Sequence, residues 1–214
     1  MQRFRIRFAR GDEIKYISHL DIMRLWERAL TRAEIRIAYS EGFSPHPRLS
    51  LAAPLAVGVT GESELLDVYT EDTVSPHWFT DAVNNQLPVG ISILGVQLVG
   101  VMLPSLQSQI RQAEYTVIVE KADGLEDVES AIESLLAAEK LPWHHERDTG
   151  KREYDLRKLI DDIKLESSDD ERCTITMVLR CGSNGSGRPE QVTLALGFKR
   201  YPLSISRTKL ILDN

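Results

Sequence analysis

Cysteine is scarce in this chain of 214 residues, which contains only Cys173 and Cys181. Two cysteines exclude a disulfide framework, and without clustered partners they cannot hold an iron–sulfur cluster or a structural zinc. The same scarcity is typical of a reducing compartment. We therefore expect a cytoplasmic protein.

Long apolar runs are also missing, because no run reaches the roughly 18 residues that a membrane span needs. The first ten residues, MQRFRIRFAR, alternate basic and apolar side chains and have no hydrophobic segment of the kind found in secretory signals. Hydrophobic residues nevertheless make up 42% of the chain, enough for a real core. We expect a globular protein with no membrane partner.

The common motifs of catalysis are absent as well. The sequence has no glycine-rich phosphate loop, no dinucleotide fingerprint, no three-cysteine radical-SAM motif and no nucleophile elbow. We expect neither a metal site nor a cofactor, and the sequence favours a binding role over an enzymatic one.

Charge is unevenly distributed along the chain. The net charge is −6, but residues 1–50 hold 10 Lys and Arg against 6 Asp and Glu, whereas residues 51–110 hold no Lys or Arg at all. The overall sign argues against indiscriminate binding to nucleic acid, while the basic N-terminal segment permits a local site for RNA or for an acidic protein.

An amphipathic helix is predicted to begin after Ser18. Ser18 and Asp21 form the S-x-x-D pattern of a helix N-cap with an acidic third residue. Apolar residues then recur at helical spacing on one face, and Arg24, Arg28 and Arg32 follow one another every four residues on the other. This arginine ridge is either an ordinary solvated face or a site for phosphates, which the planar guanidinium fork suits.

A stiff segment follows the helix, with the sequence YSEGFSPHP at residues 39–47. Gly42 permits a turn with positive φ, and Pro45 and Pro47 hold the backbone extended around His46. The segment is either a rigid loop or a recognition loop that shares one face with the ridge. The binding residues that we predict are Ser18, Arg24, Arg28, Arg32, Tyr39, Ser40, Gly42, Phe43, His46 and Arg48.

Histidine offers the strongest alternative to a purely binding role. His19 and His46 near a basic ridge would suit general acid–base cleavage of RNA, and they are the candidate catalytic residues. A metal site made of His19, Asp21 and His46 is disfavoured, because residues two apart at a helix start diverge and Asp21 already serves the cap.

The order of the expected elements indicates an α+β fold. Residues 1–103 are expected to form strand, helix, strand, strand, helix and strand, which is the ferredoxin-like order. Residues 104–113 are expected to be a linker or a short connecting helix. Residues 114–214 begin in the same way, so we expect two ferredoxin-like domains in tandem, the second divergent, each with an antiparallel sheet and helices on one face.

Several runs of this sequence resemble those of the radical-SAM-linked protein family, a domain of unknown function (DUF2344). They are KYISHLD, RLWERALTRAEIRIAYSEGFSPHPRLSLAAPLAVGVTGESELLD and, later, DLRKLI, GRPEQV and SRTKL. The resemblance implies a radical-SAM protein as partner. Genes of the family often lie near genes for ribosomal proteins and an RNA-processing nuclease. The family has no agreed activity. The chain departs from the family at Leu51-Ala52-Ala53, where members often carry an aromatic residue.

From the residues and the resemblance together, we expect a non-catalytic accessory or substrate-binding protein. It would work with a radical-SAM enzyme on RNA or on ribosome-related substrates. The alternatives are an RNA-processing enzyme that uses His19 and His46, and an adaptor that binds only protein.

Overall fold

The protein is described by a computed structural model that covers residues 1–121, 125, 127–147, 150–182 and 185–213. The chain divides into two compact units. Unit 1 comprises Met1–Ile110 with Leu212–Asn214, and unit 2 comprises Arg111–Ile211. Each unit is described by itself.

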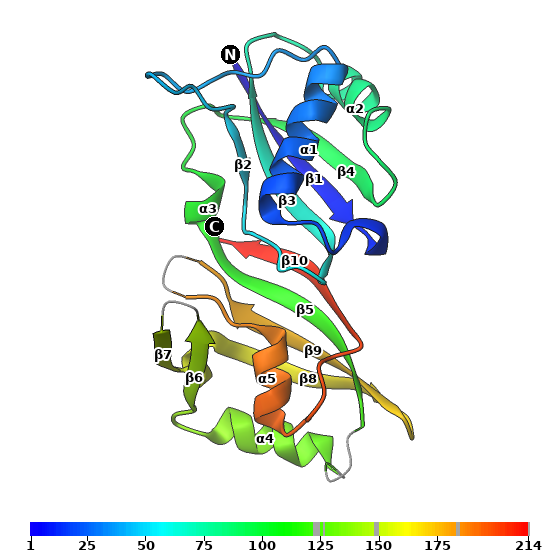
Figure 1. The fold of residues 1–214 in the computed structure, drawn as a ribbon, viewed down its shortest axis with the longest axis vertical. Helices are drawn as coiled ribbons and strands as arrows, with labels where there is room; N and C mark the ends of the chain where they lie inside the picture. Colours follow the sequence, from blue (N-terminus) through cyan, green and yellow to red (C-terminus); the bar gives the residue numbers. More distant parts are fainter. Residues whose placement is uncertain (122–124, 126, 148–149, 183–184, 214) are drawn as a thin grey trace. The chain divides into compact units, whose positions relative to one another are not determined.

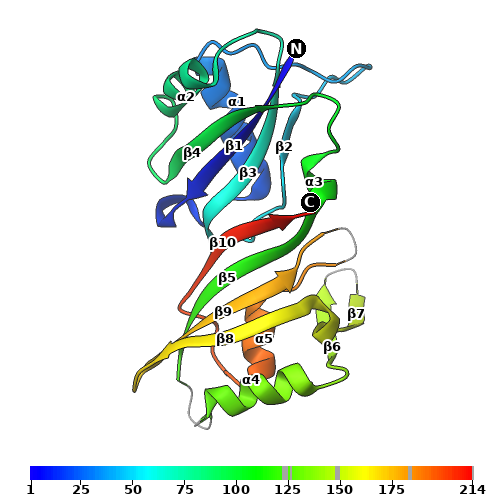
Figure 2. The same cartoon turned by 180° about the vertical axis from the view of Figure 1, so that it is seen from behind.

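Unit 1 is built from strands and helices that alternate in sequence. Its elements are β1 (Gln2–Arg10), η1 (Asp12–Ile14), α1 (His19–Arg32), β2 (Leu49–Leu51), β3 (Thr60–Thr70), α2 (Pro76–Asn84), β4 (Ile91–Val99) and α3 (Leu106–Gln109). The strand order is β4-β1-β3-β2, and every neighbouring pair is antiparallel. Figures 1 and 2 show α1 and α2 on the same face of this sheet.

The core of unit 1 lies between the sheet and its two helices. Alternation along β1 points Phe4, Ile6 and Phe8 toward the helices, and all three are buried. The Phe8 ring meets Trp26 of α1 edge-to-face with centroids 5.0 Å apart, and Phe4 stacks on Phe79 of α2 at 4.4 Å. These aromatic pairs fix both helices on the sheet.

The predicted cap at Ser18 is confirmed, and α2 also begins at a serine cap. The Ser18 hydroxyl accepts a hydrogen bond from the backbone N–H of Asp21, and Ser75 accepts one from Trp78. Pro76 occupies the first turn of α2, where its missing N–H costs nothing.

Unit 2 has a similar order with one insertion. Its elements are β5 (Ile110–Glu120), α4 (Val128–Ala137), β6 (Pro142–Arg147), β7 (Gly150–Asp155), η2 (Leu156–Leu159), β8 (Ile160–Ser168), β9 (Arg172–Arg180), α5 (Pro189–Leu196) and β10 (Ser204–Leu212). The strand order is β10-β5-β9-β8, while β6 and β7 form a separate hairpin. Helices α4 and α5 cover one face of the sheet (Figures 1 and 2).

The predicted α+β class, with antiparallel sheets and helices, is confirmed. The stretch expected as a linker or short helix, residues 104–113, contains α3 and the first residues of β5. Among the described residues, none of the helices is long and apolar enough to cross a membrane.

A buried ion cluster ties the outer face of the unit 1 sheet together. Asp67 of β3 accepts hydrogen bonds from Arg3 (Nη2, 2.6 Å) and from Arg5 (Nε, 2.9 Å). Arg3 also donates to the backbone oxygens of Leu103 (2.7 Å) and Pro104 (2.9 Å). The side chains of Arg3 and Asp67 are each 1% exposed, so neither charge has water to replace its partner.

We predict that Asp67→Asn lowers the free energy of unfolding by about 3–5 kcal/mol, because it leaves buried arginines without their counter-charge. Chemical denaturation measures the change. The control is Asp72→Asn, which removes the partner of Arg36, an exposed residue at the surface of the same unit; its loss should be much smaller. Equal decreases in the free energy of unfolding for the two variants would contradict the claim that burial makes the Asp67 ion pairs important for stability.

Candidate phosphate-binding groove

A groove of about 550 Å³ runs along α1 in unit 1. We call it the arginine groove. Its walls come from the exposed side of α1 and from the turn that follows α2. The lining residues are Ile17, Asp21, Arg24, Leu25, Arg28, Arg32, Asn85, Gln86, Leu87 and Pro88.

The three predicted ridge arginines all line this groove. Four helical residues rise about 6 Å, so the guanidinium groups follow one another along one wall. Arg32 donates from Nη2 to the backbone oxygen of Gln86 at 2.9 Å, and Arg24 makes a long contact of 3.4 Å with Asp21. Arg28 makes no hydrogen bond or ion pair within the described part of the chain. The middle cation of the row is therefore available to a ligand.

The rest of the groove suits a partly apolar anion. Ile17, Leu25, Leu87 and Pro88 provide carbon surface, while Asn85 and Gln86 bring side-chain amides that can donate hydrogen bonds. The volume lies within the range of small-ligand sites. The groove can thus hold a phosphate on the arginines and an apolar or planar group beside it.

Asp21 is the one carboxylate in the groove lining, and it is already engaged. The Ser18 hydroxyl donates to its Oδ2 at 2.7 Å, and this hydrogen bond, with the nearby charge of Arg24, lowers the pKa of Asp21 below its ordinary value. Ser18, which we predicted as a binding residue, is not part of the groove lining. Its contacts show a capping role for this side chain.

The predicted recognition segment forms a loop that is closed at its base. Tyr39 and Pro47 form an antiparallel bridge, the N–H of Ser40 donates to the oxygen of His46 (2.9 Å), and the N–H of His46 donates to the Ser40 hydroxyl (3.0 Å). Gly42 has φ +121°, as the predicted turn requires. We call this segment the Tyr39–Pro47 loop.

The tip of the Tyr39–Pro47 loop carries an unshielded aromatic ring. Phe43 is fully exposed, and Tyr39 at the base is 50% exposed. A phenyl ring exposed on a loop with a hydrogen-bonded base is suited to dock into a partner. Burying the ring is favourable, and the loop backbone loses little conformational entropy on binding.

Arg48, also predicted as a binding residue, is used within unit 1. Its guanidinium lies 4.0 Å from the centre of the Tyr69 ring, and its Nη1 lies 3.2 Å from the Met1 sulfur. Arg36 is likewise paired, with Asp72. The base of the loop therefore offers no unengaged arginine.

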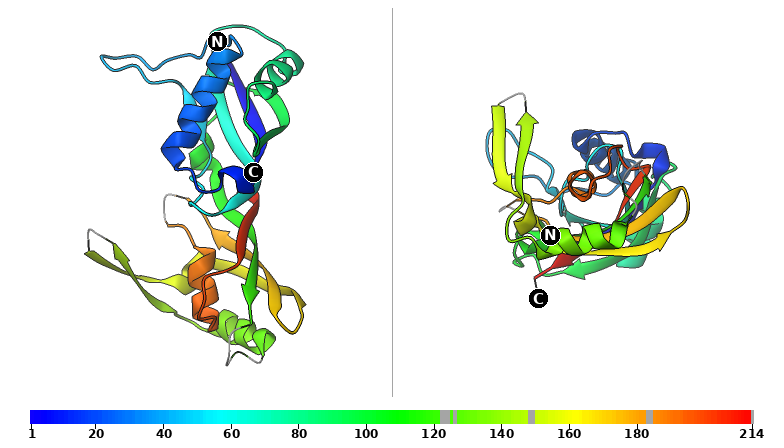
Figure 3. Two further views of the ribbon diagram at one scale, coloured as in Figure 1. Left: turned by 45° about the vertical axis from the view of Figure 1, so that its right-hand side comes forward. Right: turned by 90° about the horizontal axis from the view of Figure 1, so that it is seen from below.

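The arginine groove and the Tyr39–Pro47 loop are separate surfaces. None of the loop residues lines the groove. Figure 3 shows the loop extending from the side of α1 opposite to α2, and the groove lies on the α2 side. The structure does not bring the two predicted binding regions onto one face.

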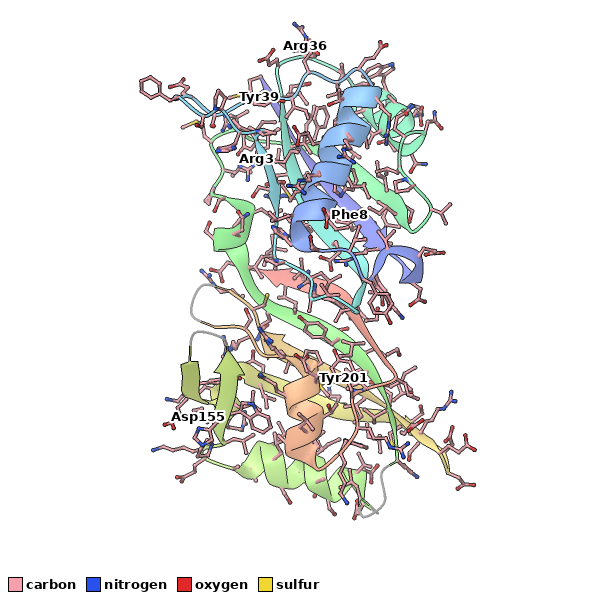
Figure 4. The ribbon with its side chains drawn as sticks, viewed as in Figure 1. Arg3, Phe8, Arg36, Tyr39, Asp155 and Tyr201 are labelled. Carbon is pink, nitrogen blue, oxygen red and sulfur yellow. The ribbon has the colours of Figure 1, made fainter. Side chains whose placement is uncertain are left out.

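The two candidate catalytic histidines also lie apart. His19 starts α1 and lines a small cavity with Phe8, whereas His46 belongs to the loop that follows the other end of the helix. Figure 4 shows Phe8 and Tyr39, which mark the two regions, well separated. Among the described residues, no group of His, Cys, Asp and Glu is placed to hold a metal ion.

The second wall of the groove was not predicted from the sequence. Asn85, Gln86, Leu87 and Pro88 follow the capped helix α2, and a proline after a helix end is a recognisable signal. That signal marks a turn, however, and says nothing about which helix the turn will face.

We predict that Ser18→Ala lowers the free energy of unfolding by about 1 kcal/mol, the usual cost of a lost N-cap. The substitution also raises the pKa of Asp21 toward its ordinary value, because the hydroxyl that stabilises the carboxylate is gone. A carboxyl-carbon NMR titration measures the shift. Ser75→Ala, which removes the equivalent cap of α2, should leave the Asp21 pKa unchanged; a similar shift in both variants would contradict the assignment.

Solved structures give a fold-level likeness. The chain resembles a chain of the crystal structure of a Cbf5–Nop10–Gar1 complex, with TM-score 0.51 and 11% identity over 95% of this chain and 48% of that one. It also resembles a chain of an H/ACA RNP bound to a substrate RNA containing 2′-deoxyuridine, with TM-score 0.47 and 12% identity over 95% and 47%. The protein spans about half the length of these chains.

None of the curated proteins matches the chain. The sequence model of one bacterial family matches residues 3–189, which include the capped helix, the arginine ridge and the Tyr39–Pro47 loop. The chain therefore belongs to the family described as an uncharacterized protein conserved in bacteria (DUF2344).

Proposed function

We propose that the protein is a non-catalytic accessory protein that binds RNA for a radical-SAM enzyme, and that the arginine groove holds the RNA phosphates. The observation that carries the proposal is the unengaged Arg28 between two further arginines in a groove of ligand size. Arginine is the preferred side chain for phosphate because its fork donates two parallel hydrogen bonds.

Several basic side chains elsewhere in unit 1 are already paired. Arg3 and Arg5 are bound to Asp67, and Arg36 to Asp72. The net charge of −6 repels a polyanion from the rest of the surface. The groove therefore gathers three arginines in one place, whereas Arg7 is a single exposed arginine outside it.

The strand orders support an assignment of both units as ferredoxin-like. In unit 1 the first strand of the pattern, β1, lies between the fourth, β4, and the third, β3, and the second, β2, lies at an edge. In unit 2 the corresponding strands are β5, β10, β9 and β8. Pairs of such domains recur in RNA-binding proteins, which is an analogy of fold. In unit 1 the helix side of the sheet is the better candidate for RNA binding. Arg3 and Asp67 fill the middle of the opposite face, and backbone oxygens of residues 100–104 accept the hydrogen bonds of Arg3.

The radical-SAM partner comes from the family resemblance, and Phe43 is the residue that we assign to it. A fully exposed ring on a pinned loop without free cations suits an apolar pocket of a protein better than a phosphate backbone. The same observation favours the alternative of a protein-binding adaptor. The acid–base alternative gains no support from the separated positions of His19 and His46.

We predict that Arg28→Ala weakens the binding of a fluorescein-labelled single-stranded RNA, measured by fluorescence anisotropy. The loss of one phosphate contact should lower the slope of log K against log salt by roughly 0.7–0.9. The control is Arg36→Ala, which removes the same charge from a residue paired with Asp72 outside the groove.

The control should leave the salt slope unchanged. Equal slopes for the wild type and Arg28→Ala would remove the groove from the binding site. Equal losses for Arg28→Ala and Arg36→Ala would show that only the overall charge matters.

We predict that Phe43→Ala leaves the stability within about 0.5 kcal/mol of the wild type, because the ring makes no packing contacts to lose. Binding to a purified radical-SAM protein, the partner that the family resemblance implies, should weaken by about 10-fold or more, the value of burying one phenylalanine. Isothermal titration calorimetry measures this affinity.

The matched control for this measurement is Tyr16→Ala, another exposed aromatic residue of unit 1. Its affinity should equal that of the wild type. Unchanged binding by Phe43→Ala would exclude the Tyr39–Pro47 loop as the docking element.

A further inference from the structure

The longest charge-free stretch of the protein contains an edge strand. Residues 82–110 include no Asp, Glu, Lys or Arg, although 27% of the chain is charged. Strand β4 lies within this stretch and pairs with β1 on one side only, at the end of the strand order of unit 1. Figure 2 shows β4 along that edge of the sheet.

Apolar side chains along this stretch are exposed. Leu94 and Leu98 of β4 are 44% and 46% exposed, and Val89 and Met102, just before and after the strand, are 78% and 94% exposed. A bare strand edge presents unpaired N–H and C=O groups, which become a template for another strand when no charge guards them.

The second unit provides a comparison within the same chain. Strand β8 also lies at the end of its strand order, and it carries Asp161, Asp162, Lys164 and Glu166 among its nine residues. Charges of this kind are the usual protection of a strand edge. Strand β4 has the same length and none of them.

A register shift limits the part of β4 that can accept a partner. The pairing with β1 runs without interruption from Arg3↔Val99 to Arg7↔Gly95 and then shifts before Phe8↔Ile93. The bulge at Leu94 bends the strand there. The regular edge available for pairing is therefore Gly95–Val99.

We propose that this edge pairs with the same edge of a second copy of the chain, antiparallel about a two-fold axis at Gln97. In this register Gln97 lies opposite its own copy, Val96 opposite Leu98, and Gly95 opposite Val99. The Val96–Leu98 pairs are apolar, and none of the pairs places like charges opposite each other, which would destabilise the sheet. Two-fold closure also ends the assembly at a dimer.

The absence of charge is what favours a second copy over a foreign strand. A strand with charges repels its own copy when like charges face each other, and it selects a partner of opposite sign. Residues 95–99 carry no charge that could select a foreign partner or oppose self-pairing. A strand of identical composition is therefore the occupant that the edge fits best.

Charge substitutions at Gln97 test the proposal. In analytical ultracentrifugation the wild-type protein should show twice the mass of one 24.2 kDa chain, in an equilibrium that depends on concentration. Gln97→Lys and Gln97→Glu should each weaken the dimer by about 10-fold or more, because a like charge then faces itself across the axis. An equimolar mixture of the two variants should restore the dimer.

The control is Gln107→Lys, an exposed glutamine on α3, which contacts β2 at the other edge of the sheet. It should sediment like the wild type, and circular dichroism should show all variants folded. A monomeric wild type, or a dimer that survives both Gln97 variants, would overturn the proposal. A mixture that stays monomeric would overturn the pairing at Gln97.

Discussion

A single helix face organises the candidate site of unit 1. Helix α1 can bury only one side against the sheet, and the side it buries carries Trp26, which contacts Phe8 edge-to-face. Because the helical period is fixed, burying that side turns the residues at positions 24, 28 and 32 outward. The packing of α1 therefore determines both which of its side chains enter the core and the direction in which the arginine row points.

The arginine row becomes a groove only because a distant segment faces it. Arg32 donates to the backbone oxygen of Gln86, and the two residues are 54 positions apart in the sequence. The turn after α2 thereby becomes the opposite wall, so the stacking of Phe4 on Phe79, which holds α2 in place, also supports the site.

Local patterns predicted much of this arrangement. The cap at Ser18 and the alternation of β1 follow from neighbouring residues, whose types and spacing can be seen directly in the sequence. The groove wall at Asn85 and Gln86 could not be predicted, because it depends on how two helices pack on the sheet. The shared face expected for the ridge and the Tyr39–Pro47 loop failed for the same reason.

The charge count was the least reliable guide to the site. The basic excess of residues 1–50 permitted a local site for an anion, yet several of these cations are not available for it. Arg3 is buried and paired, Arg36 is paired with Asp72, and Arg48 lies over the Tyr69 ring. An alternating strand reads as half exposed, but Arg3 is buried because the carbonyls of Leu103 and Pro104 cover it. Fewer cations therefore remain for a ligand than the composition suggests.

The two proposed surfaces would reinforce each other. The groove wall leads directly into β4, since Pro88 lines the groove and Ile91 begins the strand. In an antiparallel pairing with Gln97 opposite Gln97, the two-fold axis is perpendicular to the sheet, so the helices of both copies lie on the same side. Both arginine grooves then face one direction. A single RNA strand that reaches from one groove to the other binds the second groove at high effective concentration. Two weak sites of three arginines each then bind the strand more tightly than either site alone.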